Sequence, residues 1–355
     1  MPLHLAWSRA QHLEHAPKVF HYMWIVSSVA LVVVVLLCLK KCVQTAAAAY
    51  RSRFRRQHVF LPRLQEAEIS LTLTPIFFAW VGWASIFEIQ TAGVMTFLIS
   101  IVTAGMLTAT RDLLLAALGE EPGVKELLKT AAPQAWWKTL PCCCLAGVCL
   151  TGEPEPLRPR HLRFGKYMVD FFVMVNLINA LTQLIAFSSV QRVEWKDGWC
   201  VTDLADQDNI TKFLAQVQGL ASPFAMFGVS VMAKGVVACL GEEDHLQMNT
   251  KGNMAGTISL FTGLGPLVAG HFARGYESPT LGPGDTLIGA AVGCPVYDKE
   301  VMTTMWFAAA LPVLMLPFAL QLQGLVQSDD AKMAHELRIE QRQKLLTAES
   351  CVEAA

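Results

Sequence analysis

Long apolar runs are the feature that most constrains how this chain can fold. They cover about residues 19–39, 69–89, 94–118, 167–187, 213–240, 254–272 and 301–322. A helix crosses the ~30 Å hydrocarbon core of a bilayer with about 20 residues, so each run is long enough to span a membrane. Charged residues make up 16% of the chain and apolar residues 53%, whereas about a quarter of an ordinary soluble domain is charged. We therefore predict an all-α polytopic membrane protein with seven transmembrane helices.

Basic residues next to these runs predict the orientation of the chain. Lys40 and Lys41 follow the first run, and five arginines come after them, at positions 51, 53, 55, 56 and 63. Loops rich in Lys and Arg stay in the cytosol. We therefore expect residues 1–18 outside the cell, a seven-helix transmembrane domain over 19–322, a cytoplasmic loop over 118–166 and a cytoplasmic tail over 323–355. The polar segment 1–18 shows no cleavable signal sequence.

The predicted cytoplasmic loop carries a cluster of thiols. Cys142, Cys143, Cys144 and Cys149 lie between the pair Trp136-Trp137 and the basic residues that precede the fourth run. Thiols at the inner membrane surface accept acyl chains, and tryptophan favours the headgroup region. We predict reversible acylation of these four cysteines, with a metal site or plain reduced thiols as alternatives. Cys38 and Cys42, which flank the two lysines, are further acylation candidates.

Two predicted outer loops carry sites that belong to the extracellular side. The loop 188–212 holds Cys200 and the sequon Asn209-Ile210-Thr211, and the loop 274–300 holds Cys294. A sequon is used for glycosylation only outside the cytosol, which agrees with the charge pattern. The compartment is oxidising, so a disulfide between Cys200 and Cys294 is one prediction and two separate thiols the other.

Polar residues inside the spans are candidates for a solute path. Asn176, Asn179 and Gln183 share one face of the fourth span, and Asp170 extends this face toward the cytosol. Such amides face protein or a water-lined cavity, so they either line a path or bond neighbouring helices. His271, near the outer end of the sixth span, is a further path candidate.

Two other features of the spans carry predictions. Arg111 and Asp112 either pair with neighbours or extend to the inner surface, and the second interpretation is favoured. Small residues recur in the sixth span, where they allow close helix packing: Ala255, Gly256, Gly263, Gly265, Ala269 and Gly270. No nucleophile-base motif, phosphate loop or HExxH sequence is present, so we expect neither an enzyme nor a cofactor.

Several segments resemble the alpha subunit of the organic solute transporter family. They are Gly123-Val124-Lys125-Glu126-Leu127-Leu128-Lys129 leading to Pro141-Cys142-Cys143-Cys144, then Leu162-Arg163-Phe164-Gly165-Lys166-Tyr167, and Gly252-Asn253-Met254 followed by Leu264-Gly265-Pro266. The resemblance covers about residues 20–325. Two departures stand out: the cysteine run is short for the family, and Gly119-Glu120-Glu121 replaces an acidic residue followed by paired glycines.

The resemblance implies a facilitative, sodium-independent transporter of amphipathic organic anions such as bile acids and conjugated steroids. It also implies a single-span beta subunit as partner and the plasma membrane as location, on the basolateral side, with retention in the endoplasmic reticulum when the partner is absent. Two alternatives remain. The first is a seven-helix receptor coupled to G proteins, against which the long arginine-rich first inner loop argues. The second is a membrane scaffold or trafficking relative that transports nothing.

Overall fold

The fold was determined as a computed structural model, which describes residues 18–52, 60–87, 92–118, 155–189, 193–196, 199–202, 205–240, 247–273 and 299–325, together with Leu128, Pro133 and Ala135. These residues form seven long helices and one hairpin: α2 (Lys18–Ser52), α3 (Phe60–Phe87), α4 (Ala92–Ala117), α7 (Pro159–Ser189), β1 (Val193–Lys196), β2 (Trp199–Thr202), α8 (Ala205–Leu240), α9 (Met248–Ala273) and α11 (Lys299–Gln323).

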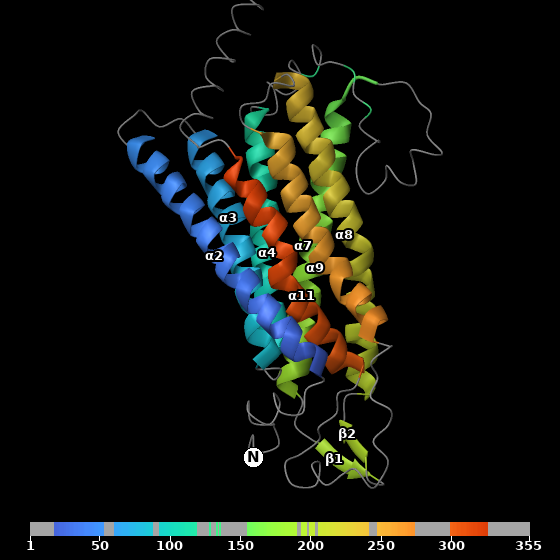
Figure 1. The fold of residues 1–355 in the computed structure, drawn as a ribbon. Coiled ribbons are helices and arrows are strands. Elements are labelled where there is room, and N and C mark those ends of the chain that lie inside the picture. Colours follow the sequence, from blue (N-terminus) through green and yellow to red (C-terminus); the bar gives the residue numbers. More distant parts are fainter. Residues whose placement is uncertain are drawn as a thin grey trace, which may run out of the picture.

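The helices run side by side in one elongated bundle (Figure 1). α4 packs against α3, α7 and α9, whereas α2 lies at the edge against α3 and α11. Successive helices alternate in direction, so α2 begins at the end of the bundle that carries the β1–β2 hairpin and α11 ends at the opposite end. The hairpin pairs antiparallel, with Trp195 opposite Cys200.

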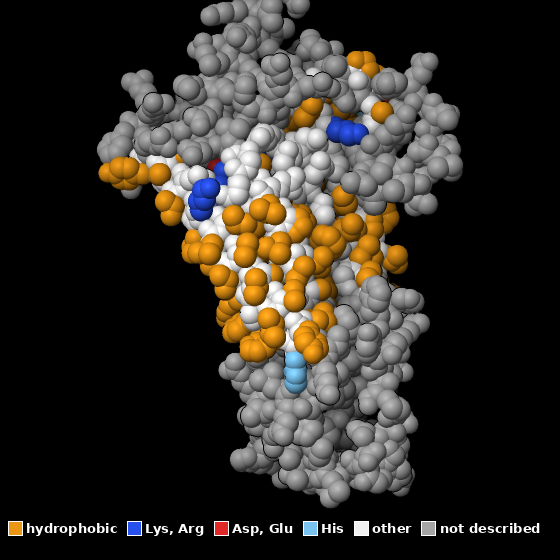
Figure 2. Space-filling model, viewed as in Figure 1, with side chains coloured by type: hydrophobic (Ala, Val, Ile, Leu, Met, Phe, Trp, Pro, Cys, Tyr) orange, Lys and Arg blue, Asp and Glu red, His pale blue; other side chains and the backbone are white. Residues whose placement is uncertain are grey.

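Five helical segments are long and apolar enough to cross a membrane: His21–Ala48, Arg63–Ser85, Phe97–Ala117, Pro159–Thr182 and Gln216–Cys239. A shorter apolar segment covers Phe307–Gln323. The helical, membrane-spanning class predicted from the sequence is therefore confirmed, while the count of seven spans stays a prediction. Figure 2 shows exposed apolar side chains forming a band over the face that includes α2, with Lys and Arg side chains at one end of it and a histidine at the other.

The helices extend beyond the apolar runs that predict them. We expected the first span to end at Lys40 and Lys41, but α2 continues to Ser52. The segment that follows includes four consecutive alanines, Ala46 to Ala49, and alanine has the highest helix propensity. The apolar run therefore marks the part of a helix that suits lipid, and the helix itself continues beyond it.

Polar side chains attach the edge helix α2 to the bundle. The Ser27 hydroxyl donates a 2.5 Å hydrogen bond to the carbonyl of Ala309 on α11. The Trp83 indole on α3 donates to the Ser28 hydroxyl at 2.9 Å. Because apolar side chains gain little from leaving lipid for protein, such bonds help to set which face of a membrane helix packs inward. The opposite face of α2 exposes Ile25, Val29 and Leu36.

Glycines allow α7, α8 and α9 to approach closely. A Cβ atom added at Gly165 on α7 would lie 2.8 Å from the carbonyl oxygen of Gly228 on α8. On α9, a Cβ at Gly252 would lie 3.0 Å from that of Ala233, and one at Gly256 would lie 3.1 Å from Met226. The prediction that small residues of the sixth span serve close packing is confirmed for Gly256.

Replacing Gly165 should separate α7 from α8. We expect Gly165→Val to lower the free energy of unfolding by about 1–3 kcal/mol, because the new side chain meets backbone atoms that cannot move aside. Thermal unfolding in detergent, followed by tryptophan fluorescence, measures the change. Gly105→Ala on α4 is the matched control, since a Cβ there meets nothing within 4 Å. Equal stability of the two variants would contradict the close contact.

Candidate functional site

A cluster of three amides lies inside the bundle where α4, α7 and α8 meet. Asn176 on α7 donates a 2.8 Å hydrogen bond from Nδ2 to the carbonyl of Ser100 on α4. Gln218 on α8 donates from Nε2 to Oδ1 of Asn176 at 2.5 Å, and Asn179 donates to Oε1 of Gln218. The three side chains are 0%, 2% and 8% exposed for Asn176, Asn179 and Gln218. All three side chains are thus buried, and each forms at least one hydrogen bond to another helix.

This amide cluster supports the packing interpretation of the polar face of α7. A side chain that lines an open path offers its donors and acceptors to water or solute. Here Asn176 and Asn179 bond to Gln218 and to the backbone of α4 instead. In this conformation the two asparagines connect three helices.

A second link between α4 and α7 is ionic. The Arg111 guanidinium donates from Nε to Oδ1 of Asp112 at 2.9 Å, and Nη1 pairs with Oδ1 of Asp170 on α7. The Arg111 side chain is 18% exposed. The favoured prediction that Arg111 extends to the membrane surface is therefore wrong, because its guanidinium pairs with Asp112 and, across the helix interface, with Asp170.

A third polar group, which we call the lysine cluster, consists of Lys41, Glu68 and Lys251. Lys251 on α9 forms an ion pair with Glu68 on α3, with 3.3 Å between Nζ and Oε1. Lys41 on α2 donates a 2.6 Å hydrogen bond to the carbonyl of Leu325, just beyond α11. The exposures of Lys41, Glu68 and Lys251 are 1%, 1% and 0%. Charges from three helices are thus buried at the end of the bundle where α11 ends.

Further bonds hold the end of α11 against this region. Gln323 donates from Nε2 to the carbonyl of Leu37 on α2 at 2.9 Å. Gln247, just before α9, donates to the carbonyl of Gly324 at 3.1 Å. Lys41 and Gln247 thus bind the carbonyls of Leu325 and Gly324, which directly follow α11, while Gln323 connects the last residue of α11 to α2. A cation there also interacts favourably with the helix dipole.

Thr45 lies one helical turn after Lys41 on the same face of α2. It is 2% exposed, and its hydroxyl has no hydrogen-bond partner among the residues that the structure describes. A buried hydroxyl without a partner loses about 1–3 kcal/mol relative to one that is hydrogen-bonded. The region around the lysine cluster therefore contains both charge and unused hydrogen-bonding capacity.

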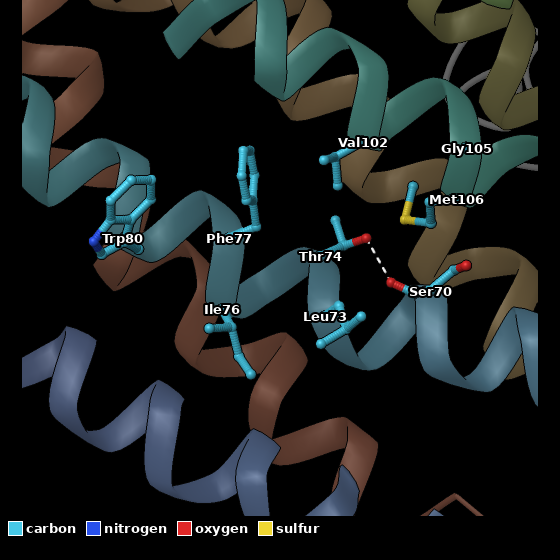
Figure 3. Close-up of a pocket in the computed structure, with 9 residues that line it drawn as sticks. All are labelled: Ser70, Leu73, Thr74, Ile76, Phe77, Trp80, Val102, Gly105 and Met106. Carbon is cyan, nitrogen blue, oxygen red and sulfur yellow. Dashed lines mark hydrogen bonds between the residues drawn. The ribbon is translucent and has the colours of Figure 1, made fainter.

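An apolar groove of about 480 Å³ lies between α3 and α4 (Figure 3). Leu73, Phe77 and Trp80 from α3 line it with Val102 and Gly105 from α4. Leu73 is 48% exposed and Trp80 45%, so the groove opens on the outer face of the bundle. In a membrane this face meets lipid hydrocarbon.

The cysteines predicted as acylation sites fall in two groups. Cys142, Cys143, Cys144 and Cys149 lie outside the described residues. Cys38 is fully buried in the hydrophobic core, so the prediction that it is an acylation candidate is wrong, because its thiol is not accessible from lipid. Cys42 is half-buried.

The remaining predicted sites are placed only by their backbone or not at all. Gln183 lies in α7 and His271 in α9, with side chains outside the described part of the structure. Asn209 lies in the second turn of α8, and Cys200 lies on β2. Cys294 is outside the described residues, so the disulfide stays a prediction.

Sequence reasoning missed Gln218 and treated Lys41 only as the end of a span. A signal existed for Glu68, the carboxylate directly before the second apolar run. An acid that close to a membrane span predicts a basic partner on another helix. Which lysine supplies that partner depends on the three-dimensional arrangement of α2, α3 and α9.

Comparison of the chain with models of protein families, with curated proteins and with solved structures finds no match. The resemblance to the organic solute transporter alpha subunit therefore stays a prediction that rests on the quoted segments.

Removing the central amide should weaken the bundle. We expect Asn176→Leu to lower the free energy of unfolding by about 1 kcal/mol, because hydrogen bonds between membrane helices contribute about 0.6 kcal/mol on average and about 1.7 at most. Thr182→Val is the control on the same helix, since the Thr182 hydroxyl bonds to its own helix. A double-mutant cycle with Gln218→Leu should show coupling, and strict additivity would contradict the direct bond.

Neutralising the buried carboxylate should have a larger effect. Glu68→Gln removes the ion pair with Lys251, and breaking a buried pair from one side costs about 3–5 kcal/mol. Glu66→Gln, at an exposed position two residues earlier on α3, is the matched control and should leave the unfolding temperature unchanged. Equal unfolding temperatures for the two variants would show that Glu68 is not buried with the lysine.

Proposed function

We propose that the protein is a facilitative, sodium-independent transporter of amphipathic organic anions, such as bile acids and conjugated steroids, and that the lysine cluster recognises the anionic group. The observation that carries this proposal is the burial of Lys41 and Lys251 inside a bundle of apolar helices. Ionisable residues in membrane helices are expensive and mark sites of function by default.

The chemistry of the lysine cluster suits a transient anion. Lys41 bonds to the Leu325 carbonyl, a neutral acceptor, at the point where α11 ends. A carboxylate or sulfate is a stronger acceptor for an ammonium group than a carbonyl is, because a charge-assisted bond with two ions is stronger. An incoming anion could therefore replace the Leu325 carbonyl as the partner of Lys41, with the Thr45 hydroxyl one turn away.

This exchange links binding to a change of shape. The Lys41 bond is one of the bonds that hold the end of α11 against α2, with that of Gln323. A ligand shifts a conformational equilibrium only by its difference in affinity for the two states. An anion that competes for Lys41 binds more tightly to the conformation in which the end of α11 is released from Lys41. Alternating access requires such a difference in affinity between two conformations.

The exposed cations support a cytoplasmic location for this end of the bundle. Among the residues that the structure describes, exposed basic side chains lie in the second half of α2 and near the starts of α3 and α7, toward the end where α11 terminates: Lys40, Arg63, Arg158, Arg160, Arg163 and Lys166. By the positive-inside rule this end faces the cytosol, and the start of α2 and the β1–β2 hairpin face outside. The proposal includes the plasma membrane as location and a single-span partner, as the resemblance implies.

Transport assays test the proposal directly. Membrane vesicles containing the full chain, with and without a co-expressed single-span beta subunit, are given a radiolabelled bile acid or steroid sulfate. We expect saturable uptake that does not require sodium. Lys41→Gln should reduce uptake about tenfold or more, equivalent to ~1.4 kcal/mol, whereas Lys41→Arg keeps the charge and should retain most of it.

The contrary results are equally definite. Folded protein at the cell surface with no flux of any tested anion, with or without the partner, would overturn the transport proposal. A G-protein response without flux would favour a receptor. Equal flux in Lys41→Gln and the parent would leave transport in place and remove the lysine cluster from the path.

A further inference from the structure

The groove between α3 and α4 contains a glycine whose presence internal packing does not explain. A Cβ at Gly105 would meet nothing within 4 Å, whereas one at Gly165 would meet the backbone of the next helix. A glycine inside a helix is less stable than alanine by roughly 0.5–1 kcal/mol. No close helix contact at Gly105 compensates for this lower stability. The space that a side chain would occupy there is open to an atom of another molecule.

The position of the groove along the membrane-spanning part of α3 limits which molecules can fill it. Ser70 and Trp80 both line it, and ten residues of helix separate them, or about 15 Å along α3. Both lie within the membrane-spanning segment Arg63–Ser85. Water is absent from the hydrocarbon core and gains nothing from an apolar wall, so an apolar molecule of the bilayer is the occupant that this position supplies.

The size of the groove favours a small molecule over a further helix. Its volume of about 480 Å³ lies within the range of roughly 300–1,000 Å³ that holds single small ligands. A helix is about 10–12 Å wide with its side chains, and would lie across Leu73 and Trp80 rather than enter between α3 and α4. The groove is a pocket for one elongated body.

The lining favours a rigid, flat body over a flexible acyl chain. Phe77 and Trp80 contribute neighbouring aromatic rings, 6.3 Å apart between centroids, and the opposite wall carries the branched Val102 (Figure 3). Ordering a flexible chain costs free energy for every rotatable bond that is fixed, and a fused ring system avoids that cost.

The two ends of the groove differ in polarity. Ser70 and Thr74 line one end, where the Thr74 hydroxyl donates to the Ser70 carbonyl at 2.6 Å, and Trp80 lies at the other. Ser70 lies seven residues, about 10 Å, from the exposed Arg63 at the polar boundary. A rigid molecule with one hydroxyl could thus direct its polar end toward Ser70 and its apolar end toward Trp80.

We propose that the α3–α4 groove is a binding site for a membrane sterol, whose ring system lies against Phe77, Trp80 and Gly105 and whose hydroxyl faces Ser70. The site is separate from the lysine cluster, because Glu68 and Ser70 lie on opposite faces of α3. It therefore stands whether or not the protein transports anions.

A photoactivatable sterol tests the site in the full chain. The protein is reconstituted in vesicles of phosphatidylcholine with a diazirine-bearing cholesterol analogue, irradiated and digested, and the labelled peptides are identified by mass spectrometry. We expect labelling on peptides from α3 and α4 that excess unlabelled cholesterol prevents and an equal excess of palmitic acid does not. Gly105→Phe should reduce this labelling about tenfold, equivalent to ~1.4 kcal/mol, and Gly105→Ala, which adds a single methyl group, should reduce it by a smaller factor.

Ala46→Phe is the matched control, since Ala46 is an exposed small residue on α2, away from the groove. It should label like the parent, and unfolding temperatures establish that each variant is folded. Three results would overturn the proposal: labelling of α3 and α4 that persists in Gly105→Phe, competition by palmitic acid as strong as by cholesterol, and label confined to other helices in the parent protein.

Discussion

Lipid hydrocarbon offers no hydrogen bonds, and this constraint governs how most polar groups in the bundle are arranged. Hydroxyls such as those of Thr72 and Thr103 donate to the carbonyl one turn earlier in their own helix, at 2.7 and 2.8 Å. The amides of Asn176 and Asn179 and the charge of Glu68 instead have their partners on other helices. The polar contacts between α4, α7 and α8, those of α2 with α3 and α11, and the ion pair between α3 and α9 follow from that need.

The two kinds of polar contact have different consequences for function. The amide cluster of Asn176, Asn179 and Gln218 is neutral and internally bonded, so it fixes the spacing of three helices. The lysine cluster is charged and lies where α11 ends. The amides already bond to one another and carry no charge, so they attract an incoming anion only weakly. The Lys41 ammonium group bonds a neutral carbonyl, and it can exchange that carbonyl for an anion, which is a stronger acceptor. The proposed transport function therefore depends on the lysine cluster and uses the amides as a fixed frame.

Much of the helical architecture could be predicted because apolar runs of span length have one structural outcome in a membrane. The shared face of Asn176 and Asn179 also followed from helical periodicity. Their partner Gln218 did not, since choosing among polar residues on other spans requires the packing of α7 against α8. Lys41 was misread for the same reason: a lysine after an apolar run predicts a membrane boundary, and only the position of α11 shows that it is buried. The groove beside Gly105 depends on the relative tilt of two helices, which no local pattern encodes.

Sidedness is the point on which the lysine cluster, the cation-rich end and the proposed direction of transport all depend. Epitope tags placed before residue 18, within the loop 118–166 and after residue 355 can be detected by antibody in intact and in permeabilised cells. The account predicts that the first tag is detected in intact cells and that the other two are detected only after permeabilisation. Detection of the loop tag and the first tag from the same side would contradict the orientation and, with it, the number of spans between them.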